Sequence, residues 1–62
     1  MRLLLTMSNG KYRHVLKLLP GNGRLYQIIG TWDGVYFIPH PDEMFTVNEI
    51  NLVYNLLKEK TK

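Results

Sequence analysis

Residues 9–34 of this chain read NGKYRHVLKLLPGNGRLYQIIGTWDG, and they indicate its fold more clearly than any other segment. Three turn signals lie here between apolar runs of strand length: Asn9-Gly10, Pro20-Gly21-Asn22-Gly23 and Asp33-Gly34. Asn-Gly and Asp-Gly favour tight hairpin turns because these residues tolerate positive φ angles. Three such turns in succession predict four antiparallel strands joined as a meander.

The predicted strands cover residues 2–8, 11–19, 24–32 and 35–38. In the second, polar and apolar side chains alternate along much of the run, as expected for a strand with one buried face. The fourth ends at Pro39, because a proline has no N–H to donate to a β-ladder.

A helix is predicted over residues 47–60. Thr46 and Glu49 have the Thr-x-x-Glu spacing of a capping box, in which each residue satisfies a backbone N–H of the other. Apolar residues then recur at helical spacing, and Lys58 and Lys60 suit the negative end of the helix dipole. The expected fold is α+β: a four-stranded antiparallel β-meander with one C-terminal α-helix packed on its apolar face, in a single domain spanning residues 1–62.

Loop length predicts which side chains share a face of the sheet. A two-residue loop at Asn9-Gly10 places Leu5 opposite His14, and a four-residue loop from Pro20 to Gly23 places Lys17 opposite Tyr26. Directly opposed residues share a face. The face expected under the helix holds Leu3, Leu5, Met7, Tyr12, His14, Leu16, Leu18, Leu25, Ile29, Tyr36 and Ile38. The opposite face is expected to combine Arg2, Lys11, Arg13, Lys17 and Arg24 with Tyr26, Trp32 and Phe37.

This second face is the predicted ligand-binding surface, formed by Lys11, Arg13, Lys17, Arg24, Tyr26, Trp32 and Phe37. Lysine and arginine neutralise phosphate, and an aromatic ring can stack on a nucleobase. No acidic residue is expected among them. We therefore expect a non-enzymatic protein that binds an anionic ligand, either a nucleotide (for example a sequestered signalling nucleotide) or a nucleic acid. An ordinary solvated face is one alternative. The other is a protein inhibitor or adaptor that caps a host enzyme through this face or the helix.

Other polar residues give weaker chemical signals. The glycines of residues 20–23 could form an anion nest, but a phosphate loop opens a helix, and here a strand follows. His14 is expected in the core, and His40 has nearby carboxylates but no third metal ligand. No serine or cysteine is positioned by a visible base. We expect no catalytic residue, no metal site and no cofactor.

The small size of the chain favours self-association. A chain of 62 residues without cysteine has a small core that no disulfide supplements. In the predicted helix, Leu52 and Leu56 widen the apolar arc to roughly 220°, more than one sheet contact needs. We therefore expect a homo-oligomer with Leu52 and Leu56 in its interface.

The formal net charge is only +3, so the distribution of charge matters more than its total. The apolar run at the N-terminus is too short for a secretory signal, and no run is long enough to cross a membrane. A cytoplasmic protein is expected. In its size the chain resembles the small accessory proteins that phages encode against host defences. That resemblance implies sequestration of a nucleotide signal or capping of a host enzyme.

Overall fold

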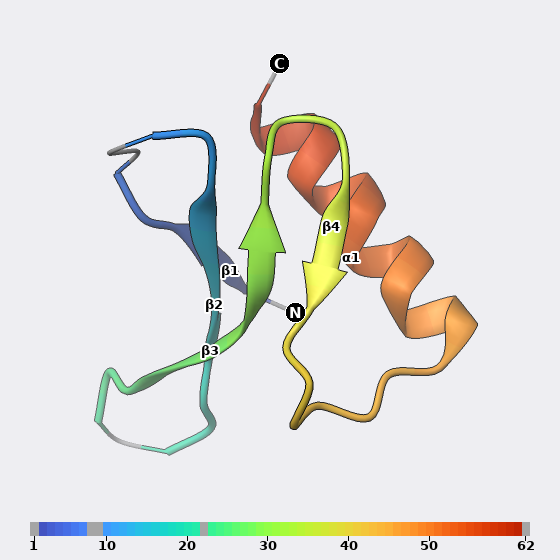
Figure 1. Ribbon diagram of the computed structural model, residues 1–62. Coiled ribbons are helices and arrows are strands. Elements are labelled where there is room, and N and C mark those ends of the chain that lie inside the picture. Colours follow the sequence, from blue (N-terminus) through green and yellow to red (C-terminus); the bar gives the residue numbers. More distant parts are fainter. Residues whose placement is uncertain (1, 8–9, 22, 62) are drawn as a thin grey trace.

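The computed structural model describes residues 2–7, 10–21 and 23–61 (Figure 1). In chain order its elements are β1 (Leu3–Leu5), β2 (Arg13–Leu18), β3 (Tyr26–Trp32), β4 (Phe37–Pro39) and α1 (Val47–Lys60). The strands form one antiparallel sheet in the order β1-β2-β3-β4. This confirms the predicted α+β meander. Parts of two predicted turns, Ser8-Asn9 and Asn22, lie outside the described residues.

The helix begins where its capping residues predict. The backbone N–H of Glu49 donates to Thr46 Oγ1 at 3.2 Å, and the N–H of Thr46 donates to Glu49 Oε1 at 3.2 Å. The N–H and the hydroxyl of Thr61 both donate to the Leu57 carbonyl and close the last turn. Within the described residues no helix is long and apolar enough to cross a membrane.

The predicted register is wrong in the first two hairpins. Leu5 lies opposite Val15 instead of His14, and Lys17 lies opposite Gln27 instead of Tyr26. In the second hairpin the reason is the length of the loop. The N–H of Leu19 donates to the Leu25 carbonyl, so the loop takes five residues, 20–24, and not four. A change of one residue reverses the face of every following side chain, so Lys17 and Tyr26 lie on opposite faces.

A β-bulge changes the alternation again in the middle of β3. Val15 pairs with Gly30 and Leu16 pairs with Ile28, which leaves Ile29 as an extra residue. Such a residue interrupts the alternation of side chains between the two faces of the sheet. Ile29 and Trp32 are therefore both buried, although a separation of three residues in a regular strand would place them on opposite faces.

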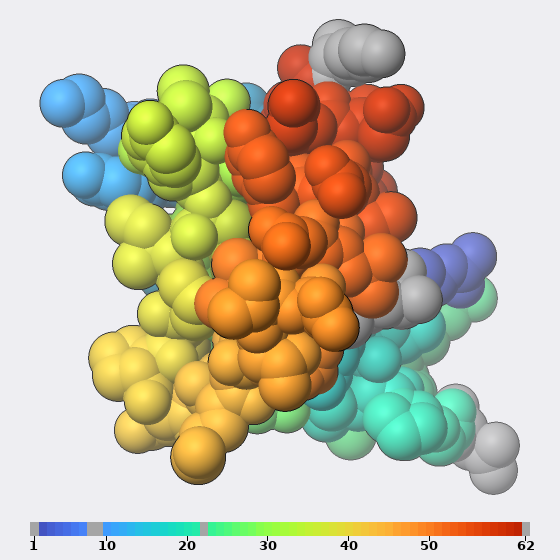
Figure 2. Space-filling view, turned by 90° about the vertical axis from the view of Figure 1, so that its right-hand side faces the viewer, coloured from blue at the N-terminus to red at the C-terminus, as the bar shows by residue number. Residues whose placement is uncertain are grey.

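The helix covers the face that was predicted to carry the ligand (Figure 2). Arg13 and Trp32 do share this face, as expected, and so does Val15, which lies two residues after Arg13 in β2; the corrected register also brings Leu3 to it. Because the bulge adds Ile29, this face presents the largest apolar surface and is the one buried. The buried core consists of Leu3, Val15, Ile29, Trp32, Phe37, Val53 and Leu57.

Leu3 and Ile29 are buried as predicted, but the side of β2 predicted to face the core, with His14 and Leu16, faces away from the helix. The corrected register places Leu4 and Ile28 on this open face beside Ile38, and the three side chains remain 44%, 44% and 50% exposed. His14 is exposed as well, so its expected place in the core is wrong. The sheet therefore has apolar side chains on both faces and a helix on one of them.

Candidate anion-binding site

A pocket of about 390 Å³ lies at one end of the sheet. Figure 1 shows the segment that leads into β2, the β3–β4 turn and the C-terminal end of α1 at this end, and the β2–β3 loop at the other. Seven residues from these segments line the pocket: Gly10, Lys11, Arg13, Trp32, Asp33, Gly34 and Thr61.

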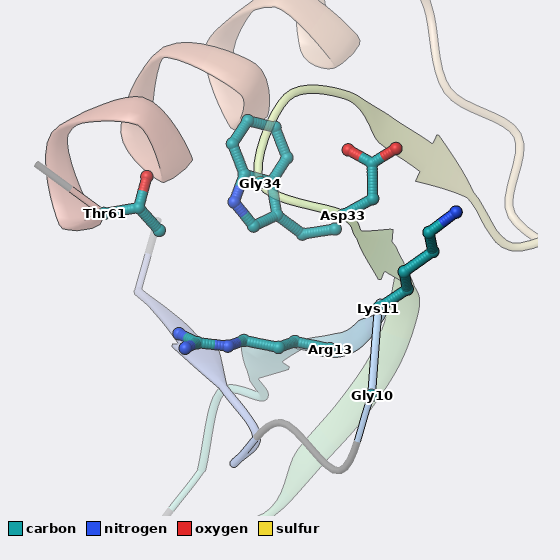
Figure 3. Close-up of a pocket in the computed structure, with 7 residues that line it drawn as sticks. Gly10, Lys11, Arg13, Asp33, Gly34 and Thr61 are labelled. Atoms are coloured by element: carbon teal, nitrogen blue, oxygen red, sulfur yellow. The ribbon is translucent and has the colours of Figure 1, made fainter.

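Two cations from nearby positions line this pocket. Arg13 is the first residue of β2, and Lys11 lies in the bend that precedes the strand. Figure 3 shows the Arg13 side chain stretched across the pocket toward Thr61, with Lys11 nearer to Asp33. Within the described ranges the one ion pair is that of His40 Nδ1 and Asp42 Oδ2, at 3.7 Å. Among these residues, neither pocket cation forms a direct ion pair.

Asp33 holds the β3–β4 turn at the rim of the pocket. Its Oδ1 accepts hydrogen bonds from the backbone N–H groups of Tyr36 at 2.7 Å and Val35 at 2.8 Å. These two bonds, first that of Tyr36, lower the pKa of the carboxyl below its ordinary value, and the charge of Lys11 adds a smaller effect in the same direction. Gly34 supplies the positive φ of 100° that the turn requires. Asp33 is thus an ionised turn residue at neutral pH.

Trp32 contributes a wall of the pocket and an unpaired donor. The residue is only 2% exposed. Its Nε1–H is buried and has no hydrogen-bond partner among the residues that the structure describes, an arrangement that costs about 1–3 kcal/mol. A ring so deeply buried has no free face for a nucleobase, so the predicted stacking role of Trp32 is wrong.

The structure scatters the other four predicted ligand residues. Lys17 is half-buried and four positions along β2 from Arg13, about 13 Å at strand rise. Arg24 is exposed in the loop at the far end of the sheet. Tyr26 lies on the open face, and Phe37 is buried against Phe45 with ring centroids 5.9 Å apart. The continuous basic and aromatic face that the sequence predicted does not exist.

Gly10, Gly34 and Thr61 line the pocket without having been predicted as site residues. The turn signals at Gly10 and Gly34 mark two hairpin ends, but strand topology alone does not place them beside the end of a helix. Thr61 reaches the pocket only because α1 crosses the sheet toward this end. In the part of the chain that the structure describes, no three side chains are grouped to hold a metal ion.

Comparison with protein-family models, curated proteins and solved structures finds no match to this chain. The geometry of the pocket is therefore the basis for assigning a function to the chain.

Proposed function

We propose that this chain is a non-enzymatic, cytoplasmic binding protein that holds the phosphate group of a small ligand in the pocket. One observation carries the proposal: Lys11 and Arg13 both line this pocket, and within the described residues neither forms an ion pair. Both side chains are cationic donors, and a phosphate offers several acceptor oxygens.

Each side chain has a distinct part in this proposal. The planar guanidinium of Arg13 suits two phosphate oxygens at once, whereas the ammonium of Lys11 acts as a point charge. Asp33 reduces the net charge of the three ionised groups to one positive unit, which disfavours a bare polyanion. Both turn hydrogen bonds end on its Oδ1, so its Oδ2 can accept a hydroxyl of the ligand. A sugar phosphate or a nucleotide carries both a phosphate and hydroxyl groups.

The distribution of charge supports a small ligand over a nucleic acid. A nucleic-acid backbone needs a track of cations, and its bases need exposed aromatic faces. Lys17 and Arg24 lie away from the pocket, and Trp32 is buried. Binding of one small anion releases few counterions, so the affinity should depend only weakly on salt.

Trp32 is the only tryptophan of the chain and gives a direct test. Its single indole N–H resonance is followed by NMR while a nucleoside monophosphate, the matching nucleoside or inorganic phosphate is added at constant ionic strength. We expect the two phosphate-bearing compounds to shift this resonance and the nucleoside to leave it in place. Arg13→Gln should weaken binding roughly tenfold or more, since a hydrogen bond to a charged group contributes about 1.5–3 kcal/mol.

Arg24→Gln is the matched control, because it removes the same charge from an exposed loop at the far end of the sheet. It should bind like the wild type. If no phosphate-bearing compound shifts the indole resonance, or if both variants weaken binding equally, the pocket is not the site. The protein inhibitor or adaptor is then the better proposal.

A further inference from the structure

We propose that the open face of the sheet is a homodimer interface on which a second copy of this chain packs face to face. The strand register arranges this face in three rows that run across the strands. The rows are Leu18 with Tyr26; Leu4 with Leu16 and Ile28; and His14 with Thr31 and Ile38.

These rows form a continuous surface without a formal charge. Leu4, Ile28 and Ile38 are about half exposed, and Tyr26 is 43% exposed. None of the strand residues in the three rows is an aspartate, glutamate, lysine or arginine. Arg2, just before β1, lies opposite Leu18 by the same register and ends that row at the β1 edge, where its carbonyl accepts from the N–H of Leu18. Contiguous apolar surface bounded by polar residues marks an interaction site.

The chain exposes more surface than a monomer of its mass should, and the difference is the area that an ordinary protein interface would bury. Its accessible surface is 4999 Å². A monomeric protein of 7.3 kDa is expected to expose about 4,200 Å². The excess is roughly 800 Å², and a standard protein interface removes about 800 Å² from each partner. The area that this chain exposes in excess therefore matches one side of a stable dimer.

The shape of the sheet favours packing of a second copy against its open face. It disfavours pairing of a strand from the second copy with an edge of the sheet. The edge strands β1 and β4 have three residues each, and β4 ends at Pro39. Short edges and proline limit strand addition. Face-to-face packing of two sheets, about 10 Å apart, instead buries every row at once.

A two-fold axis near the central Leu16–Ile28 pair sets apolar side chains against apolar side chains. It also leaves Arg2 of each copy at the rim. A hollow of about 230 Å³ beside Ile28 and Ile38 can take a side chain of the partner. The strand residues of the rows offer no opposite charge to a charged partner surface. The same apolar face of a second copy therefore matches this surface better.

This interface differs from the one that the sequence predicted on the helix. Leu56 already packs against the core, and Leu52 alone remains 49% exposed. The helix and the open face lie on opposite sides of the sheet, so separate substitutions distinguish them. The proposed anion pocket lies on the helix side, so loss of the dimer should leave anion binding in place.

The test is sedimentation velocity of the wild type, Ile28→Glu, Ile38→Glu and Leu52→Glu from micromolar to submillimolar concentration. All three positions are about half exposed in the monomer, so a charge there need not unfold it. We expect a wild-type dimer, monomers for Ile28→Glu and Ile38→Glu with unchanged circular dichroism, and a dimer for Leu52→Glu. A monomeric wild type, or dissociation by Leu52→Glu alone, overturns the proposal.

A second measurement needs no substitution and decides the matter if the sheet variants unfold. In a dimer prepared from isotope-labelled and unlabelled chains, isotope-filtered NMR reports contacts between copies. Contacts between methyl groups of Leu16, Ile28 or Ile38 in different chains support the proposal. Intermolecular contacts confined to helix side chains such as Leu52 overturn it.

Discussion

The indole of Trp32 packs against the ring of Tyr54, with ring centroids 5.8 Å apart and planes inclined by 50°. This contact joins β3 to α1, and the Nζ of Lys58 lies 5.3 Å from the centroid of the Tyr54 ring on the helix side. A small sheet needs such a partner, because isolated hairpins are marginally stable in water. The stability of the domain therefore depends strongly on a residue that looked from the sequence like a ligand contact.

Trp32→Ala should unfold much of the protein. Replacing a buried tryptophan by alanine costs about 3–5 kcal/mol, a large share of the stability of a small domain. Tyr36→Ala is the control, because this aromatic side chain is 67% exposed and lies outside the core. Urea denaturation followed by circular dichroism measures both. Equal losses in the two variants would contradict the assignment of Trp32 to the core.

Gly30→Ala should destabilise the sheet where β3 meets β4. A Cβ at this position would lie 2.5 Å from Phe37 Cε1 and would also overlap the backbone carbonyl of Ile38. Overpacking of this kind costs about 1–3 kcal/mol. Gly10→Ala is the matched control, since an added Cβ there meets no atom within 4 Å. Melting temperatures of the two variants give the comparison, and a Gly30→Ala protein as stable as the control would refute the close contact.

Thr46→Ala should lower the stability of the domain by about 1 kcal/mol, because it leaves a helix N–H without its acceptor. Thr46→Ser keeps the hydroxyl and should retain most of that stability. Chemical denaturation of both variants gives the result. A loss of the same size in Thr46→Ser would assign the effect to the missing methyl group instead of the cap.

The lowered pKa of Asp33 predicts a dependence of stability on pH. A carboxyl whose pKa is lower in the folded than in the unfolded state stabilises the fold above its unfolded pKa, about 3.9. This contribution falls as the pH drops through the folded pKa, because the protonated carboxyl is a weaker acceptor for Tyr36 and Val35. Asp33→Asn keeps an acceptor oxygen without the charge, so its stability should decline less on acidification.

Denaturation curves between neutral pH and the acid limit of folding measure that decline. Glu59→Gln, which removes an exposed carboxylate from the last turn of α1, should decline as the wild type does. A decline in Asp33→Asn as steep as that of the wild type would show that Asp33 does not contribute to the acid sensitivity.

Structural features that depend only on residues close together in the sequence were predictable. The strand order, the capping box of Thr46 and the use of Asp33 in a turn follow from local hydrogen bonding, and the structure confirms them. Which face would be buried was not predictable. Both faces are apolar, and the choice depends on one residue in the second hairpin loop and on the bulge at Ile29.

The candidate site was predictable only in part for the same reason. Lys11 and Arg13 were identified by their charge and spacing, and both line the pocket. The pattern also selected Trp32, but with the wrong role, because exposure of an aromatic ring depends on where the helix packs. Thr61 gave no signal, since its place in the pocket depends on the path of α1 across the sheet.

The bulge at Ile29 also has an evolutionary consequence. It gives β3 one residue more than its partner needs, so the strand holds a spare position. A single deletion between Tyr26 and Gly30 can be absorbed by straightening the strand, and Trp32 then keeps its place opposite Arg13. The same deletion removes Ile29 or moves it opposite Leu16 on the open face, so a related chain one residue shorter at this point keeps the pocket but needs another apolar side chain to fill the core.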